Sequence, residues 1–210
     1  MDTKFLTIGL LIIATLFTLG SGCGKDNTSK PCRGGRYSFA ATSEFSPQRE
    51  MYNVGDTIFL NSTISKTLYD NVSLQNVDYS NSLGIGGNLA IGLLDSTTET
   101  ILYALPKFKI INFLGSTTPI LNAVDGGLNI LYKENLSYDF KLALVCLNKG
   151  LYRFGITDLG SQGLVGKDCT NAGFGMQVTN TNKHINLFQF AIGYTPDAQA
   201  IKTIYCFRVQ

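Results

Sequence analysis

Cysteine and histidine are the residues of this 210-residue chain that could bind a metal ion, form disulfides or take part in catalysis. The sequence contains five cysteines, at Cys23, Cys32, Cys146, Cys169 and Cys206. It contains one histidine, His184, and no Cys-x-x-Cys pair. A structural zinc ion needs four nitrogen or sulfur ligands, usually in closely spaced pairs. We therefore expect no metal ion.

His184 is also the only imidazole that could act as a catalytic base. It lies in the polar segment Asn180–Asn186, where no nucleophile motif accompanies it. This context predicts a solvent-exposed turn histidine. The aspartates fall mostly at turns, where their side chains bond to nearby backbone amides, so no glycosidase-type carboxylate pair is indicated. We expect no catalytic residue and hence no enzyme.

The glycine cluster in Gly155–Gly175 could in principle form a phosphate-binding loop. Its spacing matches neither G-x-G-x-x-G nor the phosphate loop, and no Gly-Lys-Ser/Thr follows. Residues that favour left-handed turns explain the composition, so we expect a loop and no cofactor. The formal net charge is +2 with no run of Lys or Arg, which argues against nucleic-acid binding.

Cys23 follows a sequence typical of a secretory signal peptide. Lys4 precedes an apolar run from Phe5 to Leu19, and small residues lead from Gly20 into Cys23. The run is shorter than the roughly 20 residues needed to span a bilayer. Cys23 resembles the lipid-bearing cysteine of a bacterial lipobox, although Leu19 lies one place earlier than usual. We expect residues 1–22 to be the signal and Cys23 to carry the lipid. Ordinary cleavage nearby, leaving Cys23 as a thiol or a disulfide half, is the alternative.

Residues 23–35 are expected to form a flexible tether, because Gly24–Lys30 contains no apolar side chain to bury. The other four cysteines would meet an oxidising compartment, where disulfides are expected in any of three full pairings. Cys206 shares parity with Arg208, and Cys169 lies in the glycine-rich segment, so we predict that these two pair. Cys146 shares parity with Leu142 and Leu144, which favours a buried thiol. Cys32 is left without an assigned partner.

Residues 36–210 read as one domain of short strands. The clearest alternation is Leu136–Cys146, and Tyr152–Ile156 resumes it after a turn at Asn148–Gly150, which predicts a hairpin over 136–156. A central strand is expected near Ile58–Ile64, a buried segment at Phe108–Leu114 and a loop at Gly115–Gly127. A helix opening at Thr195–Asp197 should precede a last strand, Thr203–Val209. The expected fold is all-β, an antiparallel β-sandwich of which the immunoglobulin-like fold is one form.

Three segments resemble a family of uncharacterised Bacteroidota lipoproteins: YNVGDTIFLNSTI, GITDLGSQGLVGKDCTNAGF and GYTPDAQAIKTIYCFRV. The resemblance implies a lipid anchor at Cys23 in the bacterial outer membrane, and leaves exposure at the cell surface open. The family carries no activity that could be transferred to particular residues.

Two classes of function fit these observations. The first is a structural or protein-interaction module that holds another envelope protein at the membrane. The alternative is a glycan-binding accessory of an outer-membrane uptake system. The chain has 10 Tyr and 13 Phe but no Trp, the best flat platform for sugars. An exposed aromatic patch would favour glycan, whereas an apolar groove or a long unpaired strand edge would favour protein.

Overall fold

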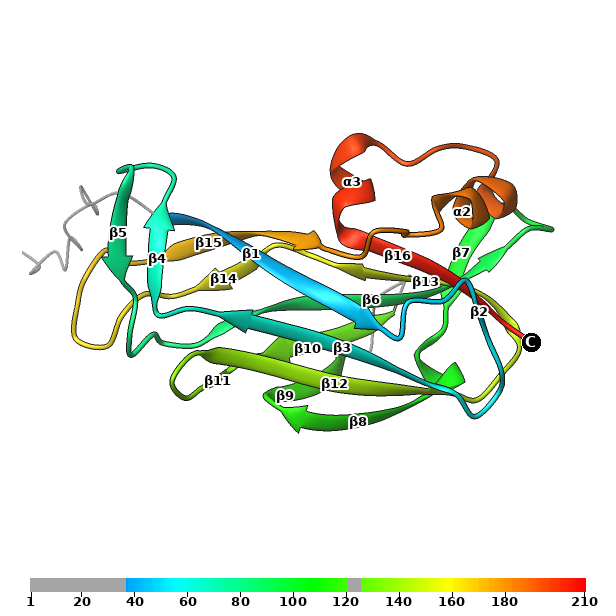
Figure 1. The fold of residues 1–210 in the computed structure, drawn as a ribbon, viewed down its shortest axis with the longest axis horizontal. Coiled ribbons are helices and arrows are strands. Elements are labelled where there is room, and N and C mark those ends of the chain that lie inside the picture. Colours follow the sequence, from blue (N-terminus) through cyan, green and yellow to red (C-terminus); the bar gives the residue numbers. More distant parts are fainter. Residues whose placement is uncertain (1–36, 121–125) are drawn as a thin grey trace, which may run out of the picture. The chain divides into compact units, whose positions relative to one another are not determined.

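The computed structural model describes residues 37–120 and 126–210, which form a β-sandwich with two helices on one side (Figure 1). The strands are β1 (Tyr37–Ser46), β2 (Met51–Tyr52), β3 (Thr57–Ile64), β4 (Thr67–Asp70), β5 (Gln75–Asp78), β6 (Ile85–Asp95), β7 (Thr100–Tyr103), β8 (Phe108–Leu114), β9 (Ser116–Ile120), β10 (Gly127–Leu131), β11 (Lys133–Glu134), β12 (Tyr138–Cys146), β13 (Gly150–Ile156), β14 (Leu159–Ser161), β15 (Ala172–Val178) and β16 (Ile204–Val209). The helices are a 3₁₀ turn at Leu105–Lys107, α2 (Ile185–Ile192) and α3 (Ala198–Thr203). None of the helices in this part of the chain is long and apolar enough to cross a bilayer.

The first sheet is built around β6. On one side β6 pairs with β13 and then β14, and on the other with β7 and β10. Outside these strands β16 pairs with β13, β15 pairs with β14, and β9 pairs with β10. Two pairs at the margin, β1 with β15 and β2 with β16, are parallel, whereas the other pairs of this sheet are antiparallel.

The second sheet contains β3, β12, β8 and β11. β1 joins the two sheets, because its first seven residues pair with β15 and its last three pair with β3. The strand expected near Ile58–Ile64 is central, since β3 lies between β1 and β12. The predicted β-sandwich is therefore confirmed, as is the short helix before the last strand, where Asp197 caps α3 by accepting from the Ala200 amide at 2.7 Å.

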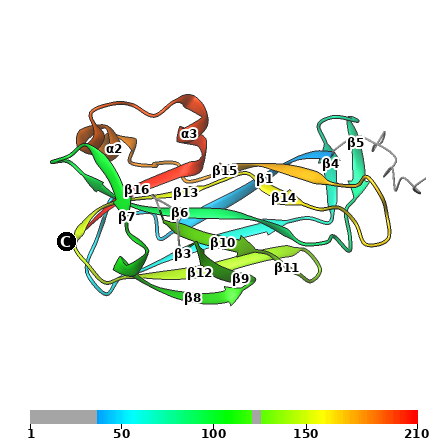
Figure 2. The same ribbon diagram turned by 180° about the vertical axis from the view of Figure 1, so that it is seen from behind.

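The predicted hairpin over 136–156 is wrong. β12 belongs to the second sheet and β13 to the first, so the chain crosses the sandwich between them (Figure 2). Both strands bury their alternate large side chains, and these inner faces meet across the core instead of lying edge to edge. The backbone of Cys146 bonds instead to Gly55 and Asp56.

The expectations for two neighbouring segments are also wrong in part. Phe108–Leu114 is a strand, β8, but most of its side chains after Phe108 are exposed or partly exposed because it pairs with β12 at the margin of the second sheet. The expected loop Gly115–Gly127 contains β9, and its residues 121–125 lie outside the described part of the chain.

The core confirms the predicted alternation of β12 and also contains the inward-facing side chains of β16. Five alternate side chains of β12 are buried, and so are the inward-facing side chains of β16: Tyr138, Phe140, Leu142, Leu144 and Cys146, then Tyr205, Phe207 and Val209. Leu136 departs from the pattern because β12 begins only at Tyr138, and its side chain is 98% exposed. Aromatic rings from both sheets pack together between them; Phe108 of the second sheet and Tyr152 of the first, for example, lie 4.9 Å apart.

Candidate functional site

The cysteines do not form the predicted bridge. Cys146 and Cys206 are both free and fully buried, and burial raises the pKa of their thiols to about 11 and about 12. The predicted Cys169–Cys206 disulfide is therefore wrong. Cys169 is disulfide-bonded, but its partner is neither Cys146 nor Cys206. Cys23 and Cys32 lie outside the described residues.

Cys206 is buried because the outward face of β16 is covered at its position. Arg208 indicated a polar face there, but α2 covers the part of that face that contains Cys206. Leu187, Phe188 and Ala191 of α2 pack in the same cluster as Cys206. The burial predicted for Cys146 is confirmed.

His184 is not the exposed turn residue that its context predicted. Its side chain is buried immediately before α2, with a left-handed backbone at φ 50°. Nδ1 lies 3.3 Å from a carboxylate oxygen of Glu50, and the ring packs against Tyr205. In residues 37–120 and 126–210 no group of three or more His, Cys, Asp or Glu side chains could hold a metal ion.

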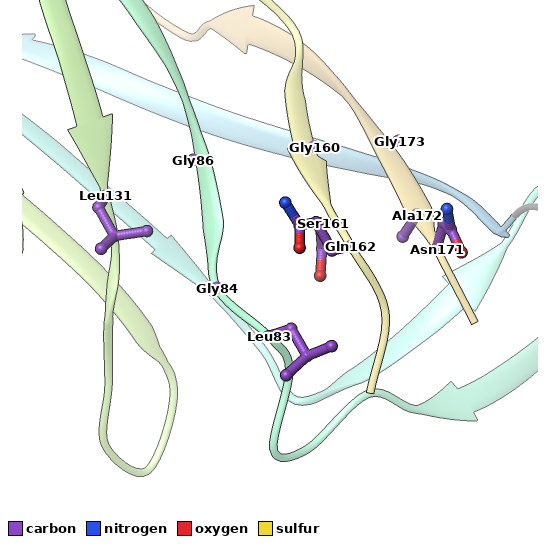
Figure 3. Close-up of a pocket in the computed structure, with 10 residues that line it drawn as sticks. All are labelled: Leu83, Gly84, Gly86, Leu131, Gly160, Ser161, Gln162, Asn171, Ala172 and Gly173. Carbon is purple, nitrogen blue, oxygen red and sulfur yellow. The ribbon is translucent and has the colours of Figure 1, made fainter. Parts of the chain in front are cut away.

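A concave surface forms a trough on the outer face of the first sheet, where β6, β14 and β15 run side by side (Figure 3). It encloses about 550 Å³. Leu83 and Leu131 form one wall, and the amide side chains of Gln162 and Asn171 stand over the other strands. We call this surface the glycine trough.

Three glycines in register make its floor. Gly160 of β14 pairs with Gly86 of β6 on one side and with Gly173 of β15 on the other. The row continues to Leu131 of β10, opposite Gly86, and to Ser38 of β1, opposite Gly173. The floor therefore presents backbone across three adjacent strands without a side chain.

The fold itself explains only part of this glycine row. A Cβ on Gly86 would lie 2.6 Å from the carbonyl oxygen of Ile130, so packing requires glycine there. A Cβ on Gly160 would meet nothing closer than 4.0 Å, and on Gly173 nothing within 4 Å, among the described atoms. Neither residue has a positive φ. Glycine inside a strand weakens it and often marks a place where a ligand or another backbone approaches closely.

A packed aromatic cluster supports the floor from below. Phe174, which follows Gly173, points into the core, where its ring lies 5.2 Å from Phe39 and 6.0 Å from Tyr79. Phe39 in turn stacks on Tyr37 at 5.7 Å. Because close-packed rings allow little movement, the trough is a preformed surface.

The rim of the trough is fixed by hydrogen bonds. The Tyr79 hydroxyl donates to the Thr170 carbonyl at 2.8 Å, and the Leu164 amide donates to Thr170 Oγ1 at 2.7 Å. The Leu83 amide donates to the Gly163 carbonyl at 2.7 Å, which ties the leucine wall to the opposite loop. Burial raises the pKa of Tyr79, so its hydroxyl remains a donor through the physiological range.

The sequence predicts a glycine-rich loop around Gly160 and Gly173, whereas both residues lie in strands. A signal was present in Gly173-Phe174-Gly175-Met176-Gln177-Val178, where every second residue is large and apolar. That period of two indicates a strand with its glycines outward. The pairing of this strand with the distant Gly86 and Gly160 could not be read from it.

No family model matches the chain, and no curated relative matches it. Several solved structures are distantly similar. The second type II cohesin module of the ScaA scaffoldin from Acetivibrio cellulolyticus is 10% identical, with a TM-score of 0.32 over 59% of this chain and 84% of that one. A type II cohesin–X-dockerin complex from the same organism gives 11% identity and a TM-score of 0.36 over 66% and 95%. The cohesin module of a Clostridium perfringens family 33 glycoside hydrolase is 9% identical, with a TM-score of 0.32 over 66% of this chain and 99% of that one. Likenesses this distant transfer neither a partner nor an activity to this chain.

Proposed function

We propose that this chain is a lipid-anchored module of the bacterial cell envelope that holds a protein partner in the glycine trough. The observation that supports this function is the floor of Gly160 and Gly173, where the described fold leaves room for a side chain. Because these glycines have no side chains and the strands rest on packed aromatic residues, an extended segment of a partner can approach the backbone to van der Waals distance. Because the site is preformed, binding would require little ordering of the module.

The walls favour a polypeptide over a sugar. The exposed Leu83 and Leu131 offer apolar contact to a partner side chain, while the amides of Gln162 and Asn171 can donate to and accept from a peptide backbone. None of the lining residues is aromatic, so the trough lacks the flat ring on which sugars stack. The two amides could also bind hydroxyl groups, which keeps the glycan-binding accessory as the second candidate.

Filling the trough tests the proposal directly. A photo-crosslinking amino acid at Gln162 or Asn171 should capture a partner protein in intact cells. The double substitution Gly160→Thr and Gly173→Thr should abolish that crosslink, because two branched side chains would stand on the floor. Gly175→Thr is the matched control: it lies on the same strand with its nearest atom at 3.8 Å but does not line the trough.

Two outcomes would redirect the assignment. Crosslinks that persist unchanged in the filled trough would exclude it as the partner site. Binding on a glycan array that the double substitution abolishes and Gly175→Thr preserves would instead support the glycan-binding function.

The lipid anchor and the outer-membrane location rest on the N-terminal sequence. Replacing Cys23 with alanine should move the protein from the membrane to the soluble fraction, because the acyl chains that hold it would be missing. A cleaved C23A protein that stays on membranes through a carbonate wash would contradict lipidation at this residue.

A further inference from the structure

The loops at one end of the sandwich each expose an aliphatic side chain. The chain enters the domain at Tyr37, at the end where the β4–β5 loop, the β11–β12 loop and the β14–β15 loop also lie (Figures 1 and 2). These loops carry four aliphatic residues that are 61–98% exposed: Val72, Leu74, Leu136 and Val165. We call this set the apolar tip.

The loops of the apolar tip are held to the start of β1 and to one another. The Asn71 amide donates to the Ser38 carbonyl, and the Ser38 amide donates to Asp70 Oδ1, both at 2.8 Å. The Val165 amide donates to the Asn81 carbonyl at 2.9 Å. The Asn81 amide donates in turn to Glu134 Oε1 at 2.9 Å. The four side chains thus project from a scaffold held by hydrogen bonds.

The charged side chains around the tip carry a small net negative charge. Three cations and five anions lie in or near these loops: Lys66, Lys133 and Lys167 with Asp70, Asp78, Glu134, Asp139 and Asp168. Lys66 and Glu134 form an ion pair of 2.9 Å. A surface of this composition has little electrostatic attraction for anionic partners, so its contacts would come from the apolar side chains.

We propose that the apolar tip rests against the lipid bilayer, with its four aliphatic side chains in the interfacial region. The inference rests on the proposed anchoring at Cys23. Even as an unstructured coil, the stretch 23–35 would span only about 20 Å on average, which holds the Tyr37 end of the domain near the lipid. Four separate aliphatic tips suit a fluid bilayer better than a protein partner, which would require a continuous patch.

The opposite end of the domain provides the comparison. Val54 and Leu147 are two exposed aliphatic side chains in the loops there, and they are 48% and 46% exposed. They lie where β2 leads into β3 and where β12 leads into β13, away from the entry of the chain. Among the described residues, the most exposed aliphatic side chains thus lie at the end where the chain enters the domain.

Fluorescence in vesicles tests the inference on the full lipidated chain. Single cysteines at Val72, Leu136 or Val165 would carry an environment-sensitive dye, with Val54 and Leu147 as controls. Cys146 and Cys206 are buried, so the folded protein should label only at the introduced site. In vesicles of phosphatidylethanolamine and phosphatidylglycerol, the tip dyes should shift to the blue and be quenched by brominated lipid. The control dyes should do neither, and high salt should leave the pattern unchanged.

A second variant guards against artefacts of the dye. Leu136→Asp with Val165→Asp should reduce lipid quenching at Val72 at least about two-fold, because burying a charge in lipid is costly. Val54→Asp with Leu147→Asp should leave it unchanged. Tip dyes that stay in water on a lipidated chain, or equal quenching at both ends, would overturn the inference and leave the anchoring intact. The mass of the N-terminal peptide reports the lipid separately, and its absence would overturn the anchoring and the inference together.

Discussion

The outer face of the first sheet has two halves that differ in what covers them. Around Leu94, Ile204 and Cys206 the face is apolar, and α2 buries it with Leu187, Phe188, Ala191 and Ile192. Around Gly86, Gly160 and Gly173 the same face carries no side chains and remains open. β6 runs through both halves, with Leu94 near one end and Gly86 near the other. The half that α2 covers presents apolar side chains for burial, whereas the open half has glycine at the corresponding positions.

The largest effect should come from the support of the open half. Phe174 is fully buried beneath the glycine trough, and Phe174→Ala should lower the free energy of unfolding by about 3–5 kcal/mol through lost burial and the cavity left behind. Urea unfolding measures the loss as a shift in midpoint. Phe190→Ala is the control, because Phe190 on α2 is exposed and its removal should change stability by less than about 0.5 kcal/mol. Equal effects of the two substitutions would show that the cluster under the trough is not packed as described.

The sequence predicts some of these elements and not others. Alternation of large apolar side chains identified β12 and β16, because burial of one face leaves a local pattern. It could not show that β12 and β13 lie in different sheets. Two consecutive strands that each bury one face have the same sequence pattern whether they pair as a hairpin or face each other across a sandwich. The burial of Cys206 could not be predicted for a related reason: residues 187–192 of α2, which lie 14 to 19 positions upstream, cover it through a tertiary contact that leaves no local pattern. The three-glycine row likewise depends on pairings between strands far apart in the sequence.

On the covered half, removing the anchor of α2 should expose one thiol selectively. Phe188→Ala should cost about 3 kcal/mol, at the lower end for a buried phenylalanine because a two-turn helix can shift to fill part of the space. With α2 loosened, Cys206 should react with an alkylating reagent at pH 8, while Cys146 in the central core should stay protected. In the unaltered protein burial raises the pKa of both thiols, so both should resist labelling.

Mass spectrometry of the labelled peptides distinguishes the cysteines. Cys169 should take no label unless the protein is first reduced, since it is disulfide-bonded. Labelling of Cys206 in the unaltered folded protein would contradict its place beneath α2.

The carboxylate of Asp70 holds the margin of the open half through hydrogen bonds and should make the free energy of unfolding depend on pH. Asp70 accepts from the amides of Ser38 and Ser73 at 2.8 Å, and Ser38 ends the row that contains the three glycines. Although burial opposes ionisation, these hydrogen bonds favour the carboxylate and lower the pKa of Asp70 from 3.8 to about 2. The stabilisation is thus fully present above about pH 4 and is lost as the pH falls towards 2.

Asp70→Ala tests this attachment. It should cost about 1–3 kcal/mol at pH 7, because buried amides lose their acceptor. It should also flatten the acid limb of the stability curve, measured by urea unfolding between pH 5 and 2. An acid limb that is as steep in D70A as in the unaltered protein would show that other carboxylates cause the loss.

The smallest effects concern the glycines, where the sign matters more than the size. If Gly173 and Gly160 are kept for a partner, Gly173→Ala and Gly160→Ala should leave the fold as stable or raise its free energy of unfolding by up to about 1 kcal/mol. Alanine costs less conformational entropy than glycine, and a Cβ would meet no atom closer than 4.0 Å at either position. Gly86→Ala should instead destabilise, because its Cβ would lie 2.6 Å from the Ile130 carbonyl oxygen. Urea unfolding of the three variants decides the matter: if Gly173→Ala and Gly160→Ala lose as much stability as Gly86→Ala, the fold itself requires glycine along the whole row. The open half would then need no binding partner to explain it.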